Sequence, residues 1–283
     1  MPVRVLCVGD VVGRAGRQAL AEHLPKLKKQ RALDCIIVNA ENIAGGSGLT
    51  PQLLEKLHRY GTNVITLGDH AYRRREVFEV FRQCEDVVRP ANFPPDAVGR
   101  ETAIYRTESG VPIAVIALLG RIFIKPILDC PFRAADRVLA TLPRGVKVVF
   151  VDVHAEATSE KVAMGWHLDG RVSCVFGTHT HIQTADERVL PGGTAYITDL
   201  GMTGPRDSVL GRRKDNVLRS LITNMPHPYD VADGDPWLHG AVVTVDEATG
   251  RATAIERIAV AAVTGNTFNN HDVADQAGRA GQS

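Results

Sequence analysis

The strongest constraint on this chain is a repeated alternation of short β-branched runs with longer helix-compatible stretches. Short apolar runs bounded by Gly, Asp or Asn are typical of buried strands, and Thr50 followed by Pro51 is typical of a helix start. The pattern predicts strands at Val3–Val8, Asp34–Asn39 and Asn63–Leu67, and helices from Arg14, over Thr50–Tyr60 and over Arg73–Gln83. Strands that alternate with helices favour a parallel sheet in an α/β fold.

The second half of the chain contains more strands than helices. Beyond three prolines at 90, 94 and 95, the pattern predicts a helix over Ala134–Leu142 and strands at Ala103–Arg106, Pro112–Leu119, Lys147–Val153, Val172–Phe176, Thr194–Thr198, Ala241–Val245 and Ala252–Ala262. The last two strands flank residues 246–250, a plausible hairpin loop. We expect one α/β domain over residues 1–265 and a disordered tail over 266–283, because the tail is polar and has no periodicity.

Composition and charge narrow the class of protein. Hydrophobic residues make up 44% of the 283 residues and charged residues 23%, which is near the globular average. The net charge of +1 favours no polyanionic partner, so phosphate recognition must be local. The five cysteines include no close pair, which gives no sign of a disulfide framework or a CxxC zinc site. Without a secretory signal or a run of about 18 apolar residues, we expect a cytoplasmic protein with no membrane span.

Acidic, amide and histidine side chains follow five of the predicted strands. In open α/β sheets, ligands bind outside the carboxyl ends of the strands, so these side chains are expected at one edge. In strand order they are Asp10, then Glu41 and Asn42, then Asp69 and His70, then His154, and finally His179 and His181. One such residue alone is typical of an ordinary turn, but the five-strand series predicts a metal site.

The donor atoms of this series suit Mn, Fe or Zn, because they belong to carboxylate, amide and imidazole groups and include no thiolate. Without His70, the series offers seven candidate ligands, which are too many for one ion. Two ions about 3.5–4 Å apart, bridged by one carboxylate, would use them all, as in phosphatases and nucleases. If the His179-Thr180-His181 segment is extended, both imidazoles lie on one face and each can address a different ion.

These motifs also resemble a known family. The chain is similar to the YmdB-like bacterial metallophosphoesterases, which belong to the calcineurin-like phosphoesterase superfamily. The resemblance is specific, runs in order through most of residues 1–262, and rests on Val8–Gly13, Val38–Asn42, Leu67–His70, Asp152–Lys161, Gly177–His181, Thr184–Asp199 and Gly201–Pro205. It implies a calcineurin-like α-β-β-α sandwich, in which central β-sheets are flanked by helices.

The resemblance also implies the ligands of two metal ions, Fe and/or Mn with Zn as an option. The first ion would be held by Asp10, Glu41, Asn42 and His181, and the second by Glu41, Asp69, His154 and His179, with Glu41 as the bridge. Most of the superfamily has a histidine at the position of Val12, whereas the YmdB-like group uses the residue that matches Asn42.

One position departs from the superfamily pattern. The Gly-Asn-His motif is written Gly68-Asp69-His70 in this chain. An aspartate keeps an oxygen ligand at the same reach, but it adds a negative charge and removes an amide donor that could hold a phosphate oxygen. We expect Asp69 to bind metal, because a carboxylate is a better ligand than an amide for a hard cation.

The resemblance implies hydrolysis of phosphodiesters, with 2′,3′-cyclic nucleotides as the leading substrate class. A hydroxide that bridges the two ions would attack phosphorus in line, and His70 is the candidate general acid for the leaving alkoxide. RNA ends are a further candidate substrate, and a homo-oligomer is compatible with the sequence. The basic clusters Arg73–Arg75, on a predicted helix, and Arg212–Lys214 are expected to be solvated surfaces rather than phosphate contacts.

The residues themselves leave two other functions open. Gly9, Gly13 and Gly16 raise the question of a dinucleotide-binding module, but their spacing does not match GxGxxG. The second alternative is a regulatory or RNA-associated binding protein whose metal site is structural or weakly active, for which Asp69 gives some support. The Gly45-Gly46-Ser47-Gly48 stretch predicts a flexible loop near the site.

Overall fold

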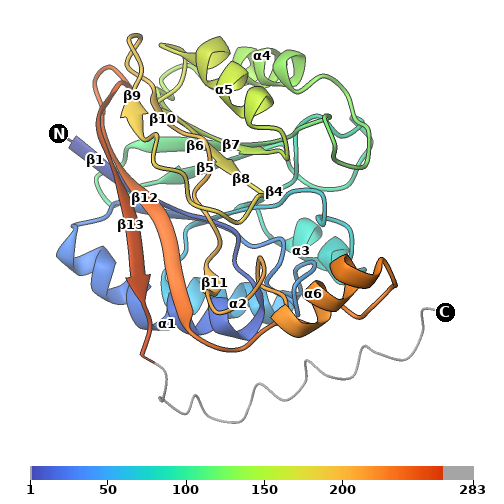
Figure 1. Ribbon diagram of the computed structural model, residues 1–283. Coiled ribbons are helices and arrows are strands. Elements are labelled where there is room, and N and C mark those ends of the chain that lie inside the picture. Colours follow the sequence, from blue (N-terminus) through green and yellow to red (C-terminus); the bar gives the residue numbers. More distant parts are fainter. Residues whose placement is uncertain (1, 264–283) are drawn as a thin grey trace.

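Two β-sheets pack face to face, and helices cover the outer face of each sheet (Figure 1). The computed structural model describes residues 2–263. Apolar side chains form three layers of contact: between the sheets, between the first sheet and α1–α3, and between the second sheet and α4–α5. The α-β-β-α sandwich expected from the sequence is confirmed. The disordered tail expected over 266–283 lies outside the described residues, and the single domain expected over 1–265 stays a prediction.

The first sheet has seven strands. Its order is β11–β12–β1–β2–β3–β4, and β13 pairs with β12. Strands β1 to β4 run parallel, whereas β12 runs antiparallel to β1. The strands are β1 (Pro2–Val8), β2 (Cys35–Asn39), β3 (Val64–Thr66), β4 (Val87–Val88), β11 (Gly204–Pro205), β12 (Pro236–Asp246) and β13 (Ala252–Ala261).

The second sheet has six strands in the order β5–β6–β7–β8–β10–β9. Its four inner strands are parallel, and β5 and β9 pair antiparallel at its edges. The strands are β5 (Thr102–Arg106), β6 (Pro112–Leu119), β7 (Val148–His154), β8 (Cys174–Thr178), β9 (Arg188–Val189) and β10 (Ala195–Ile197).

Strand β1 shows why the sequence selects this stacking. Successive side chains of a strand point to opposite faces. Val5 and Cys7 therefore pack between the two sheets, while Leu6 and Val8 pack against the helices. Because both faces are buried from Val5 onward, residues Val5–Val8 form an unbroken apolar run, which is the signature of a covered parallel sheet.

The helices are α1 (Gly13–Gln30), α2 (Pro51–Tyr60), α3 (Val77–Gln83), α4 (Pro131–Thr141), α5 (Thr158–Leu168) and α6 (Lys214–Thr223). The start of α2 is confirmed, since the Thr50 hydroxyl accepts a hydrogen bond from the Leu53 amide at 3.4 Å. The predicted hairpin of β12 and β13 is also confirmed. Among residues 2–263, no helix combines the length and the apolar character needed to cross a membrane.

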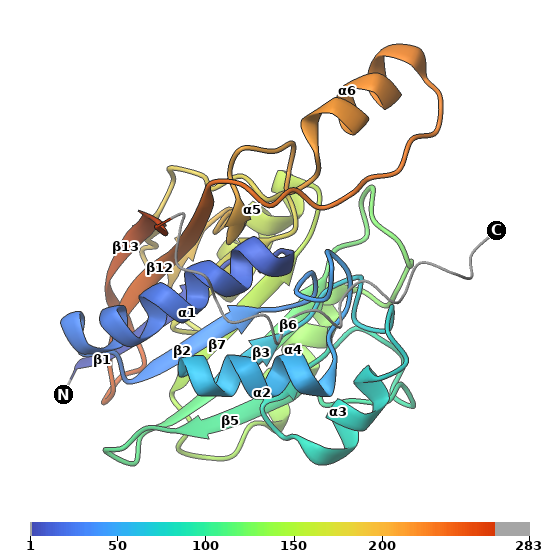
Figure 2. The ribbon, with the colours of Figure 1, turned by 90° about the horizontal axis from the view of Figure 1, so that it is seen from below.

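The start predicted for α3 is wrong, and two helices were not predicted. Helix α3 begins at Val77 rather than Arg73, and Arg74 instead donates hydrogen bonds to the carbonyls of Ala44 and Ser47. Helix α5 buries Glu160 and Lys161, which hides its apolar pattern. Helix α6 buries only Val217 among its own residues and lies away from the two sheets (Figure 2).

A buried ion pair links α5 to the loop between β10 and β11. The Lys161 ammonium lies 2.6 Å from a carboxylate oxygen of Asp199, and both side chains are almost fully buried. The same oxygen accepts hydrogen bonds from the backbone amide and the hydroxyl of Thr180. The pair therefore fixes the segment that carries His179 and His181.

We expect Lys161→Met to lower the free energy of unfolding by about 3–5 kcal/mol, because it leaves the Asp199 carboxylate buried without its cation. Urea denaturation of the metal-free protein measures this change. Arg31→Met is the matched control, since it removes an ion pair with Glu256 in which both side chains are largely exposed, and we expect a loss below about 1 kcal/mol. Equal losses for the two variants would contradict a dominant role of the buried pair.

Candidate metal centre

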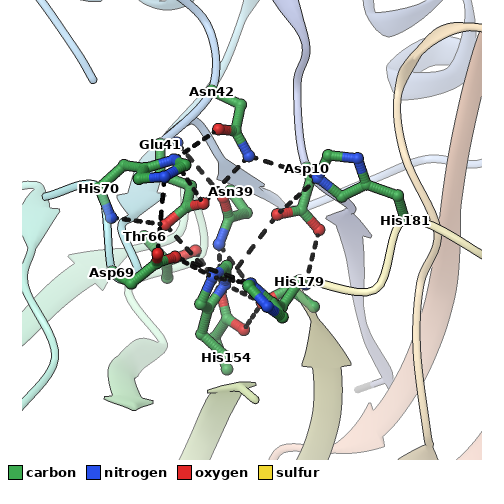
Figure 3. Close-up of polar contacts among 12 residues, drawn as sticks. Asp10, Asn39, Glu41, Asn42, Thr66, Asp69, His70, His154, His179 and His181 are labelled. Carbon is green, nitrogen blue, oxygen red and sulfur yellow. Dashed lines mark hydrogen bonds and ion pairs between the residues drawn. The ribbon is translucent and has the colours of Figure 1, made fainter. Parts of the chain in front are cut away.

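The carboxyl ends of both sheets meet at one cluster of side chains (Figure 3). The first sheet supplies oxygen-bearing groups from the turns after β1, β2 and β3. The second sheet supplies imidazoles from the end of β7 and the turn after β8. All eight side chains expected from the sequence lie in this cluster, namely Asp10, Glu41, Asn42, Asp69, His70, His154, His179 and His181. The five strand ends are thus divided between two sheets.

Four of these residues can hold one cation. Potential ligand atoms of Glu41, Asp69, His154 and His179 all lie within 4.8 Å of one another. Nε2 of His154 lies 3.0 Å from Asp69 Oδ1 and 3.3 Å from Glu41 Oε2. Nδ1 of His179 lies 3.0 Å from the same His154 nitrogen. These are the residues that the resemblance implies for the second ion.

The other expected ligand set surrounds Asp10. Its Oδ1 atom is buried and has no hydrogen-bond partner among the described residues, and it lies 3.8 Å from Nε2 of His181. An unpartnered buried carboxylate oxygen is costly, so this atom fits a cation. The Asn42 amide nitrogen faces Glu41 Oε1 at 3.0 Å and His181 Nε2 at 3.4 Å. Ligation through the Asn42 oxygen therefore requires the amide to rotate by half a turn.

The segment that carries the two histidines is not extended. His179 has a φ of 97° and His181 a φ of 65°, in the left-handed region that non-glycine residues seldom adopt. The condition under which both rings would share one face, an extended segment, is therefore not met. The two rings nevertheless reach different partners, since His179 lies against His154 and His181 faces Asp10. Besides the Asp199 contacts, a hydrogen bond from the His179 amide to Asp10 Oδ2 at 3.0 Å stabilises this conformation.

The electrostatics of the cluster favour added positive charge. Burial, with the charges of Asp69 and Asp10, raises the pKa of Glu41 to about 8 against the opposing effect of His154. Burial disfavours a charged His154, but Glu41 and the other carboxylates outweigh it and raise the pKa of His154 to about 10. Burial and the adjacent His154 lower the pKa of His179 to about 4. A proton on His154 thus partly neutralises the surrounding carboxylates. A metal cation would neutralise them more fully, and its binding would release that proton.

Close packing preserves the space between the ligands. A Cβ atom at Gly68 would overlap both Glu41 Oε2 and His154 Cδ2. Such contacts are far inside van der Waals distance, so any larger residue at position 68 would displace one of the two ligands. The glycine of the Gly68-Asp69-His70 motif is therefore required by the approach of both sheets.

Three groups that the sequence did not single out contact the second ring nitrogen of a candidate ligand. The Thr178 hydroxyl lies 2.9 Å from Nδ1 of His154. The Glu156 carboxylate lies 3.1 Å from Nε2 of His179, and the Leu210 carbonyl lies 3.0 Å from Nδ1 of His181. Contacts of this kind set the tautomer and orientation of metal-binding imidazoles. Thr178 directly precedes His179 and Glu156 follows His154 by two residues, whereas Leu210 is distant in sequence from every ligand and carried no signal.

The basic clusters are not both solvated surfaces. Arg212 is half-buried and donates hydrogen bonds to the carbonyls of Gly46 and Tyr229, so the solvated role is wrong for Arg212, as it is for Arg74. The two guanidinium groups hold the Gly45–Gly48 loop beside the cluster. Arg213 and Lys214 are exposed and pair with acidic neighbours, as expected of a solvated surface.

Comparisons with known proteins agree with this geometry. The family model described as YmdB-like protein matches residues 6–258. The chain is 45% identical over 258 residues to a 2′,3′-cyclic-nucleotide 2′-phosphodiesterase of Bacillus subtilis (strain 168), covering 91% of this chain and 97% of that protein.

Two solved structures share the fold. A hypothetical protein from Thermus thermophilus superposes with a TM-score of 0.86 at 39% identity, covering 92% of this chain and 100% of that chain. A phosphatase from Mycoplasma pneumoniae also gives a TM-score of 0.86, at 33% identity, covering 92% of this chain and 94% of that chain. The chain therefore belongs to the YmdB-like family, and it is a hydrolase of the phosphoesterase class.

Proposed function

We propose that this chain is a metal-dependent phosphodiesterase that hydrolyses 2′,3′-cyclic nucleotides at a two-metal centre. The observation that carries the proposal is the buried cluster in which Asp10 Oδ1 has no hydrogen-bond partner among the described residues, beside four residues with mutually close ligand atoms. The substrate class comes from the similarity to the Bacillus subtilis enzyme. RNA ends as substrates, a homo-oligomer and a cytoplasmic location stay predictions.

The donor set suits Fe and/or Mn, with Zn as an option, because it combines carboxylates and imidazoles without thiolates. Asp10, Glu41, Asn42 and His181 would hold one cation, and Glu41, Asp69, His154 and His179 the other. When bound, two such cations lower the pKa of a water molecule and neutralise charge on the phosphate oxygens. The buried Glu41 carboxylate lies between the two sets, since it contacts both Asn42 and His154.

His70 is placed to donate a proton to the leaving group. Its Nδ1 atom lies 2.8 Å from the Asn42 oxygen and 3.4 Å from Glu41 Oε1, so the Glu41 carboxylate would still accept the Nδ1 hydrogen once Asn42 rotates toward a cation. Its Nε2 atom lies 3.5 Å from Asp69 Oδ2, and about a quarter of the side chain is exposed. Burial lowers the pKa of His70 against the opposing charge of Asp69, which makes the imidazolium a stronger acid. Nε2 is therefore the nitrogen that would protonate the ribose oxygen as the P–O2′ bond breaks.

The charge of the substrate also fits the site. A cyclic phosphodiester carries one negative charge, so it needs less positive charge than a phosphomonoester. Arg74 and Arg212 donate hydrogen bonds to the Ser47 and Gly46 carbonyls of the Gly45–Gly48 loop. We infer that the two cations, rather than these arginines, supply most of the charge that binds the phosphate.

A second candidate is a regulatory or RNA-associated protein whose metal site is structural or weakly active. Asp69 favours it, because a carboxylate at this position cannot donate a hydrogen bond to a phosphate oxygen. Two results together would favour this candidate. The protein would bind a specific macromolecule even after the metals are removed, and it would show no diesterase turnover with Mn or Fe supplied.

The function is tested by metal analysis of the purified chain, followed by hydrolysis of 2′,3′-cyclic AMP and of bis-p-nitrophenyl phosphate. We expect turnover of both with Mn or Fe bound. His154→Ala should lower turnover by at least about 100-fold, because it removes a ligand nitrogen that contacts both Glu41 and Asp69. Unchanged activity in this variant would indicate a contaminating enzyme or a different site.

The general-acid role of His70 predicts different losses of turnover for the two substrates. His70→Asn should lower turnover of 2′,3′-cyclic AMP by about 10²–10⁴-fold with both metals retained. The loss should be much smaller for bis-p-nitrophenyl phosphate, because p-nitrophenolate leaves without a proton. Equal losses for the two substrates would remove His70 from proton donation.

The role of Asp69 is tested by counting metals. Asp69→Ala should reduce the metal content from two ions per chain to one, since Asp69 Oδ1 lies at the ring nitrogens of both His154 and His179. Asp69→Asn, which restores the superfamily residue, should retain two ions and serves as the control. Two ions in the alanine variant would show that Asp69 is not a ligand.

A further inference from the structure

Asp152 is a fully buried carboxylate in β7, two residues before His154, and the Thr178 hydroxyl lies between the two side chains. His154 is shown with the rest of the cluster in Figure 3. Neutral groups surround it. The hydroxyl of Thr66 donates to Oδ2 at 2.5 Å, the amide of Asn39 to the same oxygen at 3.0 Å, and the hydroxyl of Thr178 to Oδ1 at 2.6 Å. All four side chains are 0% exposed. Burial of this acid is expensive, so its position calls for an explanation.

The direction of these hydrogen bonds determines the state of His154. A carboxylate only accepts, so the single hydroxyl hydrogen of Thr178 points to Asp152. The Thr178 oxygen can then only accept from Nδ1 of His154, which lies 2.9 Å away. This arrangement keeps the hydrogen of a neutral His154 ring on Nδ1. The lone pair of Nε2 then faces Glu41 and Asp69, where a cation would bind.

We propose that Asp152 is a positioning residue that acts through Thr178 to hold His154 as a metal ligand. The proposal rests on the metal centre of the proposed function. Hydrogen-bonded partners of metal-binding histidines commonly raise the basicity of the ligand and fix its orientation. The other two imidazoles of the centre have a carboxylate or a backbone carbonyl as direct partners. His154 instead reaches its carboxylate through a hydroxyl.

A purely structural role is the competing explanation. Asn39 and Thr66 belong to β2 and β3 of the first sheet, whereas Asp152 and Thr178 belong to β7 and β8 of the second. The carboxylate therefore also links the two sheets. A loss of stability alone would not separate the two roles, so the test must read metal binding.

Two threonines provide a matched pair of variants. Thr178→Val and Thr66→Val each remove one hydroxyl from the same carboxylate with little change of shape, but only Thr178 contacts His154. We expect Thr178→Val to weaken Mn²⁺ binding at the second site by about 10–100-fold in calorimetric titration. Thr66→Val should leave this affinity unchanged, and Thr178→Ser should restore it. Urea unfolding of the metal-free proteins should show similar losses of stability for both valine variants.

An equal change of Mn²⁺ affinity in the two valine variants, or none in either, would overturn the positioning role. If that result were obtained while the wild-type protein binds Mn²⁺ and hydrolyses the diester, the proposed function would still stand. A wild-type protein that binds none of Mn²⁺, Fe²⁺ and Zn²⁺ would overturn both proposals.

A measurement on the wild-type chain guards against misfolding of the variants. In the Zn²⁺-loaded protein, ¹⁵N–¹H correlation spectra of the imidazoles distinguish the two tautomers. We expect the His154 Nδ1 hydrogen to be present and protected from exchange, because it is buried against Thr178. A resonance that places the hydrogen on Nε2 would contradict the proposal.

Discussion

The face-to-face contact of two sheets is the constraint on which the rest of the molecule depends. Val5 and Cys7 from the first sheet meet Phe150 and Phe176 from the second in one buried apolar layer. Because this layer aligns the carboxyl ends of both sheets, oxygen donors from one sheet and imidazoles from the other occupy the same space. Neither sheet alone contains the residues of either proposed metal site. Non-directional hydrophobic packing thus sets the geometry of the most directional chemistry in the protein.

Around that layer, buried charges are compensated in different ways. Asp199 has the ammonium of Lys161, and Asp152 has three neutral donors. Asp10 keeps one oxygen without a hydrogen-bond partner in the described part of the chain. The first two carboxylates accept hydrogen bonds from Thr180 and Thr178, which lie beside the histidines, and the third is the one that we propose to bind a cation.

Much of the fold and of the site could be predicted from the sequence because both depend on local pattern. Apolar runs define the strands, and polar residues directly after them define the strand-end cluster. What escaped prediction depends on contacts between distant segments. A lysine such as Lys161 is expected at the surface, and its burial depends on the ion pair with Asp199. The pattern predicts Arg74 in a helix, but its guanidinium instead donates hydrogen bonds to the carbonyls of Ala44 and Ser47. The left-handed conformation of His179 likewise depends on partners far along the chain.

The division of ligands between the sheets has a consequence for chain entropy. Asp10 and His181, which face each other across the centre, are separated by most of the length of the fold. A cation held by both would act as a reversible cross-link that closes a very long loop, and closure of long loops removes the most freedom from an unfolded chain. Loading of the centre would therefore resist separation of the two sheets, so metal supply would govern the lifetime of the folded enzyme as well as its turnover.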